Sequence, residues 1–497
     1  MHVRRWAPYD MAPWRAAGIT DLRDFVVAVA PFAGPVALLR RPSESSGSRS
    51  LVLFTASGSQ LAVIPWQRYD DVAPLVHLAW TDALRLVAVL ENGLCTCFSL
   101  TGIAETTFPM LPPTTNEKIV RCESWGGGIV ALTDKMTLIQ VLAPDSEQPK
   151  LSLRPDDEAS DARFPTCMAI IEPRRLQSQH PTILLGMSDR SLVELSIEGD
   201  YTQIADETIL LAPISRIAAS PNGLLVAVFT LDGVLTVLHT SGDGRRLSFD
   251  TQRETGPDAM CWCGDDAVVL HWRGLGVVMV NLTGAWLRFP YSETEAVALS
   301  QEIDCCRIYH ASGHDVIIRV PSCIERVKGV GSNAAGGVLF RAMAALDVGD
   351  TEAQASLCST LQHQKMLQQA INDCIDAGGN EFDYAAQSAF LRAASHGKEL
   401  VDESLLDVSP LQADDGSVSS PAVELDPEAF VRMCSKLRVL NALRQPDVGF
   451  PLTVAEFDCL GPEAVMRRLI AMRQRPLARK MCKSLSITVD GLFDGSH

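Results

Sequence analysis

LLVAVFTLDGVLTVLH, residues 224–239, places two short apolar runs on either side of Asp232-Gly233. Valine, leucine and threonine in such runs favour β-strands, and Asp-Gly is typical of a tight hairpin loop. This stretch therefore predicts one β-hairpin in which the chain reverses at Gly233.

The same arrangement recurs along the first two thirds of the chain. Six further segments place a Gly or Asp between two apolar runs: 51–64, 85–100, 128–142, 182–197, 267–282 and 306–320. Successive turn residues are 35 to 55 residues apart, with most spacings near 40. Such a period is typical of β-propeller blades, which have about four strands each. Seven hairpins predict about seven WD40-like blades, and the weakly patterned outer strands leave that count open by one.

Near Arg341 the apolar spacing changes from every second residue to every third or fourth. One helical face is formed by Leu367, Ile371, Cys374 and Ile375. The pair Gly378-Gly379 is expected to end that helix, and a second helix over about 384–396 is expected to stop at Gly397.

Capping signals mark further helix starts. Thr453 and Glu456 form a capping box, and Pro462 and Pro476 suit a first helical turn. Behind Asp426-Pro427, one apolar side is formed by Phe430, Met433, Leu437 and Leu440. Short helices in succession predict an α-solenoid of stacked pairs. The prediction is thus all-β followed by all-α: a propeller over 1–340 and a solenoid over 341–497.

Residues 402–428 carry eight acidic residues and no Lys or Arg, with DDGSVSSP at their centre. A segment of this composition cannot bury enough apolar surface to order itself. We expect a disordered acidic insertion here.

The net charge of the chain argues against one class of function, nucleic-acid binding. The chain has 497 residues and a formal net charge of -17, which argues against a general nucleic-acid binder because such proteins need a basic footprint. The tail from residue 429 to 497 is the exception, with 11 Lys/Arg against 6 Asp/Glu. A solvated helical face is the favoured interpretation of these charges, ahead of a site for an acidic partner.

The cysteines indicate the cellular compartment, and one apolar stretch has to be tested as a possible membrane span. The 14 cysteines lie within strand and helix patterns, as reduced core residues of a cytosolic protein would. Residues 25–39 are the most apolar stretch, but at 15 residues they are shorter than a membrane span and contain Pro31, Gly34 and Pro35. We expect two strands joined by a turn, and any membrane role to be peripheral.

Residue patterns that suggest chemistry are weak. Gly331 to Gly337 has the glycine spacing of a phosphate loop but lacks its lysine, so a flexible joint is favoured. The pairs Cys95/Cys97 and Cys261/Cys263 fit core packing of strands better than zinc binding. His310 and His314 are expected to be surface residues of a hairpin turn. We therefore predict no catalytic, cofactor-binding or metal-binding residues and no enzyme activity.

Several longer strings resemble a known family. YDMAPWRAAGITDLRDFVVAVAPFAGPVALLRRP (9–42), AMCWCGDDAVVLHW (259–272) and EIDCCRIYHASGHDVIIRVP (302–321) resemble the propeller of the vacuolar protein sorting-associated protein 16 family. The helical strings over 374–398 and 430–482 are similar to the same family and are the most specific.

The resemblance implies a scaffold subunit of the class C core shared by the HOPS and CORVET tethering complexes. Such complexes hold endosomal, lysosomal or vacuolar membranes together and promote SNARE-mediated fusion. The implied partners are the vacuolar protein sorting-associated proteins 11, 18 and 33, with indirect SNARE and Rab GTPase association. The implied location is cytoplasmic and peripheral on late endosomes, lysosomes or vacuoles. No cofactor and no nucleic acid are implied.

Two departures from the family pattern are expected to matter. Family members continue through a longer solenoid whose distal part holds the Sec/Munc-type subunit, so binding of that partner is in question for a chain ending at residue 497. The acidic insertion over 402–428 is the second departure.

Two alternatives remain open on the sequence. One is another propeller–solenoid scaffold, such as a vesicle-coat or ciliary-transport subunit. The other is a propeller enzyme with its site in the central channel, which would need convergent polar groups at one channel mouth.

Overall fold

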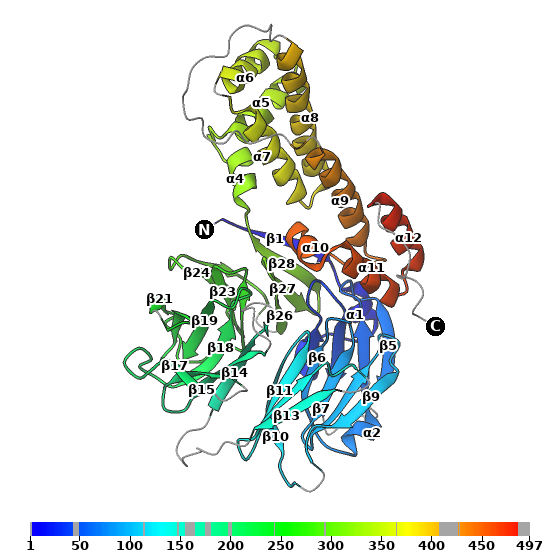
Figure 1. The fold of residues 1–497 in the computed structure, drawn as a ribbon, viewed down its shortest axis with the longest axis vertical. Helices are drawn as coiled ribbons and strands as arrows, with labels where there is room; N and C mark the ends of the chain where they lie inside the picture. Colours follow the sequence, from blue (N-terminus) through cyan, green and yellow to red (C-terminus); the bar gives the residue numbers. More distant parts are fainter. Residues whose placement is uncertain are drawn as a thin grey trace.

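A computed structural model shows a ring of β-sheets followed by a rod of helices (Figure 1). It describes residues 2–485 apart from 43–48, 113–114, 147–148, 155–164, 174–179, 197–200, 243, 293–294, 364, 407–425 and 427. No helix among the described residues is both long enough and apolar enough to cross a bilayer.

The ring consists of seven antiparallel sheets of four strands each, which confirms the predicted seven-bladed propeller. The first three are β2 (Phe25–Val29), β3 (Val36–Arg40), β4 (Ser50–Phe54) and β5 (Gln60–Pro65); β6 (Leu75–Trp80), β7 (Leu86–Leu90), β8 (Leu94–Phe98) and β9 (Ala104–Pro109); and β10 (Ile119–Trp125), β11 (Gly128–Thr133), β12 (Leu138–Leu142) and β13 (Lys150–Arg154). The next three are β14 (Pro165–Ile171), β15 (Thr182–Met187), β16 (Leu192–Ser196) and β17 (Tyr201–Ala205); β18 (Ile214–Ala219), β19 (Leu225–Thr230), β20 (Val234–His239) and β21 (Arg245–Asp250); and β22 (Ala259–Cys263), β23 (Ala267–Trp272), β24 (Gly276–Asn281) and β25 (Trp286–Phe289). The seventh contains β1 (Val3–Tyr9), β26 (Val297–Gln301), β27 (Cys305–His310) and β28 (Gly313–Arg319).

The predicted hairpin at 224–239 is β19 followed by β20, with Leu225 opposite His239. Gly233 has a φ of 85°, and a Cβ there would lie 2.2 Å from the carbonyl oxygen of Arg253. No other residue type fits that turn, because both the backbone angle and the space exclude a side chain. The predicted strand pair at 25–39 is β2 and β3, paired from Phe25↔Arg40 to Val29↔Val36.

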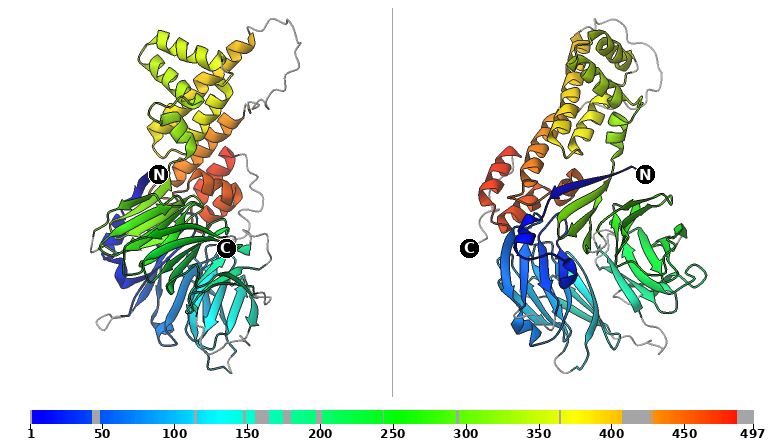
Figure 2. Two further views of the ribbon diagram at one scale, coloured as in Figure 1. Left: turned by 90° about the vertical axis from the view of Figure 1, so that its left-hand side faces the viewer. Right: turned by 180° about the vertical axis from the view of Figure 1, so that it is seen from behind.

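The N-terminal strand closes the ring. β1 pairs antiparallel with β28, from Val3↔Arg319 to Tyr9↔His314, so the last blade combines both ends of the propeller sequence (Figure 2). Sequence patterning did not predict this strand, because VRRWAPY contains two arginines and lacks a hairpin partner beside it. Three short helical elements flank the first blade in the sequence. They are α1 (Ala12–Ala16) and the 3₁₀ turn η1 (Leu22–Asp24) before it, and α2 (Gln67–Asp70) after it.

The helical part begins earlier than the expected boundary at residue 341, since α4 follows β28 after two residues. Its helices are α4 (Ser322–Lys328), α5 (Ala335–Asp347), α6 (Thr351–His363), α7 (Leu367–Gly379), α8 (Tyr384–Leu406), α9 (Ala429–Leu443), α10 (Val454–Leu460), α11 (Pro462–Ala471) and α12 (Arg475–Ser484).

Two glycine-based expectations were wrong for the same reason. Gly336 and Gly337 lie inside α5, where a Cβ on Gly336 would sit 2.5 Å from Cβ of Asp373 on α7. Gly397 does not end α8, because it faces Ile371 of α7, and a Cβ there would lie 2.7 Å from that side chain. These glycines let neighbouring helices pack closely. Of the predicted acidic insertion, the first five residues belong to α8, and 407–425 and 427 lie outside the described residues.

Candidate functional site at the junction of the ring and the helices

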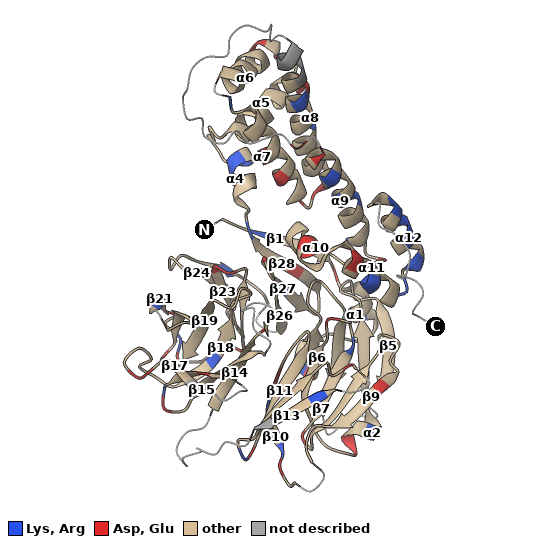
Figure 3. Cartoon of the chain, viewed as in Figure 1, with Lys and Arg blue, Asp and Glu red and all other residues tan. Residues whose placement is uncertain are grey.

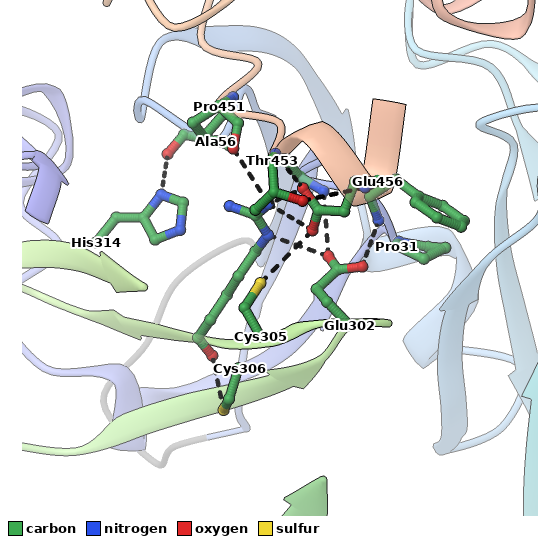
Figure 4. A network of polar contacts seen from close by, with 12 residues as sticks. Pro31, Ala56, Glu302, Cys305, Cys306, His314, Pro451, Thr453 and Glu456 are labelled. Carbon is green, nitrogen blue, oxygen red and sulfur yellow. Dashed lines mark hydrogen bonds and ion pairs between the residues drawn. The ribbon is translucent and has the colours of Figure 1, made fainter. Parts of the chain in front are cut away.

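Helices α10 and α11 lie on the ring where its first and last blades meet (Figure 1), and Figure 4 shows the polar contacts at this place from close by. Arg468 of α11 donates from Nη1 to the carbonyl of Pro31, 2.7 Å away in the β2–β3 turn. Gly449, before α10, approaches the β4–β5 turn so closely that a Cβ would lie 2.5 Å from Oγ of Ser57. One apolar cluster combines residues of the first two blades with residues of α9 to α12. The helices are therefore packed onto the ring and share its core.

A buried arginine is the centre of this junction. Arg307 of β27 has no exposed side-chain surface, and its Nη2 donates to Oε2 and Oε1 of Glu456 at 2.6 and 2.7 Å. Nη2 also donates to the carbonyl of Pro451 at 3.1 Å, while Nε donates to Oε1 of Glu302 at 3.1 Å. Thus one guanidinium joins the last blade to the start of α10.

Glu302 ties the last blade to the first. Its two carboxylate oxygens accept from the backbone amides of Phe32 and Ala33, at 2.8 and 3.1 Å. Phe32 and Ala33 have φ angles of 58° and 53°, a left-handed conformation that is uncommon for residues other than glycine. That conformation turns two successive amides toward the same carboxylate.

Glu456 has a second role in the capping box at the start of α10, where Thr453 is the N-cap residue. Oγ1 of Thr453 accepts from the Glu456 amide at 3.0 Å, and Oε2 of Glu456 accepts from the Thr453 amide at 2.8 Å. The capping box predicted at these two residues is therefore present. The Glu456 carboxylate of this capping box also binds Arg307, so folding of α10 and docking on the ring are coupled.

Burial controls the ionisation of this cluster. Desolvation, with the nearby charge of Glu456, raises the pKa of Glu302 to about 7 and that of Asp304 to about 7. Burial works against the charge of Arg307, but the carboxylates around it outweigh this effect and raise its pKa. A charged arginine thus holds two acids in a site that water does not reach.

Asp304, Cys305 and Glu456 each offer an atom within 4.8 Å of the others, the spacing of a metal site. A cation there would lie beside the guanidinium of Arg307, which already binds both oxygens of Glu456. Like charges at this separation repel strongly in a buried site. The donor set therefore fits the resident arginine better than a metal ion.

The N-terminal strand reinforces the junction from the other side. The Trp6 ring of β1 stacks on Phe382, between α7 and α8, with centroids 4.1 Å apart. Arg4 donates to Oε1 of Glu381 at 2.5 Å, and the guanidinium of Arg444 lies 4.9 Å from the Phe382 centroid. β1 therefore holds both the last blade and the rod.

A channel of about 1160 Å³ runs through the ring, lined by β2, β6, β10, β14, β18 and β26 and by residues of α10 and α11. His77 Nε2 lies 2.9 Å from Oγ of Ser124. Desolvation lowers the pKa of His77 to about 4 and raises that of Glu123 to about 7. No carboxylate among the described residues is hydrogen-bonded to the other ring nitrogen of His77, so the pair lacks the orienting group of a nucleophile–base site.

The cysteines and histidines that were weighed in the sequence as possible metal ligands are buried core residues. Cys95 and Cys97 lie in one apolar cluster and Cys261 and Cys263 in another. The expectation that His310 and His314 are surface residues was wrong: their exposed fractions are 6% and 0%. His310 contacts Glu295 and Asp315, and His314 stacks on Tyr309, because the turn is covered by β1 and the first blade.

Arg307 and Glu302 were missed by the sequence reasoning. The signal for Arg307 was its place inside the strand Cys305–His310, between cysteine and isoleucine, where a buried charge needs a partner. Nothing near it in the sequence identifies Glu456, which lies 149 residues away.

Residues 13–409 match the family model described as Vps16, N-terminal region. The chain belongs to the Vps16 family. It is 27% identical over 487 residues to Protein VACUOLELESS1 of Arabidopsis thaliana, covering 94% of this chain and 53% of that protein. It is 28% identical over 494 residues to the vacuolar protein sorting-associated protein 16 homologue of Dictyostelium discoideum, covering 95% and 54%.

The family resemblance found in the sequence is thus confirmed, and the chain spans about half the length of the curated relatives it matches. Among solved structures, the Cps50 (Swd1) β-propeller domain of Myceliophteria thermophila is similar with a TM-score of 0.42 at 10% identity, over 60% of this chain and 96% of that one. At this level the likeness carries no functional argument.

Proposed function

We propose that this chain is a non-catalytic scaffold subunit of a HOPS/CORVET-type membrane-tethering complex. Its place would be peripheral on late endosomes, lysosomes or vacuoles, in vesicle docking before SNARE-mediated fusion. The observation that carries the proposal is the Vps16 family match over residues 13–409. The partners would be the vacuolar protein sorting-associated proteins 11 and 18, and protein 33 through a longer helical region.

The geometry supports a scaffold because the ring and the rod are joined by a shared core and a buried ion network. Such a junction holds the ring and the rod together, as a scaffold that organises several partners requires. The channel offers an incomplete pair, His77 and Ser124, instead of an assembled acid–base site.

The test is affinity purification of the tagged full-length gene product from cells. Co-purification of the class C subunits supports the proposal, and their consistent absence refutes it. Proximity labelling of the same cells separates the alternative scaffolds, because enrichment of Golgi-coat or ciliary proteins instead of late-endosomal ones would assign the chain to another assembly.

A further inference from the structure

The last helix of the described chain exposes an unusual density of positive charge. Between residues 462 and 485 there are seven Lys or Arg and one acidic residue, Glu463, in a chain whose net charge is -17. Five of these cations are exposed on α12 and the turn before it, and Figure 3 shows the blue stretches along this helix. We call the five residues the α12 basic face: Arg473, Arg475, Arg479, Lys480 and Lys483.

The basic face lies opposite the side by which α12 packs on the protein. Four of the cations lie on the helix at positions i, i+4, i+5 and i+8, within an arc of about 140° at 3.6 residues per turn. The buried residues of the helix are Ala478, Met481 and Cys482. Its apolar side is thus already used for packing in the core shared with the ring.

This arrangement restricts the kind of anionic partner. Because the apolar side is buried, the helix has nothing to insert into a bilayer, and attraction to an anionic surface would be electrostatic. None of the five cations lines the channel or the smaller cavity beside β1. Long, exposed side chains on a convex helix suit a broad anionic surface better than a shaped acidic ligand.

We propose that the α12 basic face binds the headgroups of an anionic lipid bilayer directly. The charge asymmetry orients the molecule, since the rest of the chain has an excess of acidic residues and is repelled by the same membrane. Binding is superficial, reversible and dependent on ionic strength, because exposed charges are screened beyond about 10 Å at 0.1 M salt. This contact goes beyond the proposed scaffold function, as it needs no other subunit.

The test is co-sedimentation of the purified chain with phosphatidylcholine vesicles that contain or lack phosphatidylserine. We expect binding only to the phosphatidylserine vesicles, with loss of binding on added salt. Each basic residue near such a surface contributes about 1 kcal/mol, so each neutralised charge should weaken binding about fivefold. The variant K480E/K483E, which reverses both charges, should therefore lose binding almost completely.

The matched control is R245E/R253E, which reverses two exposed cations in and just after β21, a strand at the opposite edge of the molecule from α12 in Figure 1. It has the same net charge as K480E/K483E and should bind like the unchanged chain. Equal binding by K480E/K483E, or equal loss in the control, would overturn the proposal. Salt-sensitive binding to polyglutamate without binding to vesicles would also overturn it, in favour of an acidic protein partner. Purification of tether subunits tests the scaffold function separately, so either proposal can fail alone.

Discussion

Arg307 and Glu456 come from elements 149 residues apart and form a bidentate ion pair at 2.6 and 2.7 Å that no solvent reaches. Arg307 belongs to a propeller strand and Glu456 to the first turn of a helix, so the pair joins the ring to the helical part of the chain. Buried ion pairs of this kind add little net stability when complete, but they are costly to break, because the partner is left charged and unpaired.

Arg307→Met should therefore destabilise the fold strongly. It leaves the carboxylates of Glu456 and Glu302 buried without their cation, at an expected cost of about 3–5 kcal/mol. Thermal melting followed by circular dichroism measures the effect. Arg273→Met is the matched control, since it breaks an ion pair with Asp258 whose side chains are 57% and 40% exposed and should cost about 1 kcal/mol or less. Equal melting of both variants would contradict this account of the junction.

The stability of the junction should depend on pH through Glu302. Its pKa is raised from 4.5 to about 7, so the folded chain binds a proton more tightly than the unfolded chain. Stability from this group is therefore lost as pH rises through that interval. Glu302→Gln removes the titration, so the difference in melting temperature between wild type and variant should change across this interval. The exposed Glu352→Gln on α6 should leave the wild-type profile as it is, and a profile unaffected by Glu302→Gln would disprove the assignment.

Trp6→Ala should loosen the ring and the rod together. The indole stacks on Phe382 of the helical part, and its strand pairs with β28 of the last blade. Hydrogen exchange should become faster in β28 and in the α7–α8 turn at once, with a loss of about 1–2 kcal/mol. Trp286→Ala, which removes an indole that is 56% exposed on β25, should change neither region. Faster exchange confined to β28 would show that β1 does not couple the two parts.

Leu440→Asp tests the apolar side predicted for the helix that became α9. The side chain has no exposed surface and lies in the core shared by the ring and the helices. An unpaired carboxylate there should cost several kcal/mol, about 3–5 for a disrupted core position. Val431→Asp on the same helix is the control, because Val431 is 52% exposed. If the two substitutions lower the melting temperature equally, the assignment of the buried side is wrong.

The amino-acid sequence determined those features that depend on neighbours in the chain. The apolar runs on either side of Asp232-Gly233, and of the turn residues in the six similar segments, predicted the hairpins and the number of blades. They could do so because the spacing of residues in a strand and the residue types of a turn are local properties. Thr453 and Glu456 predicted the start of α10 for the same reason, as a capping box spans four residues.

Only the tertiary structure decided how these elements meet. The pairing of β1 with β28, the burial of His310 and His314, and the partner of Arg307 all depend on residues more than a hundred positions away or on the closed ring. The roles of Gly336 and Gly397 show the same limit, because the sequence alone does not distinguish a glycine that admits a neighbouring helix from one in a flexible joint or at a helix end. Contacts between distant segments depend on the shapes of the packed surfaces and on the removal of water from them. The pattern of residues within one short segment does not predict either.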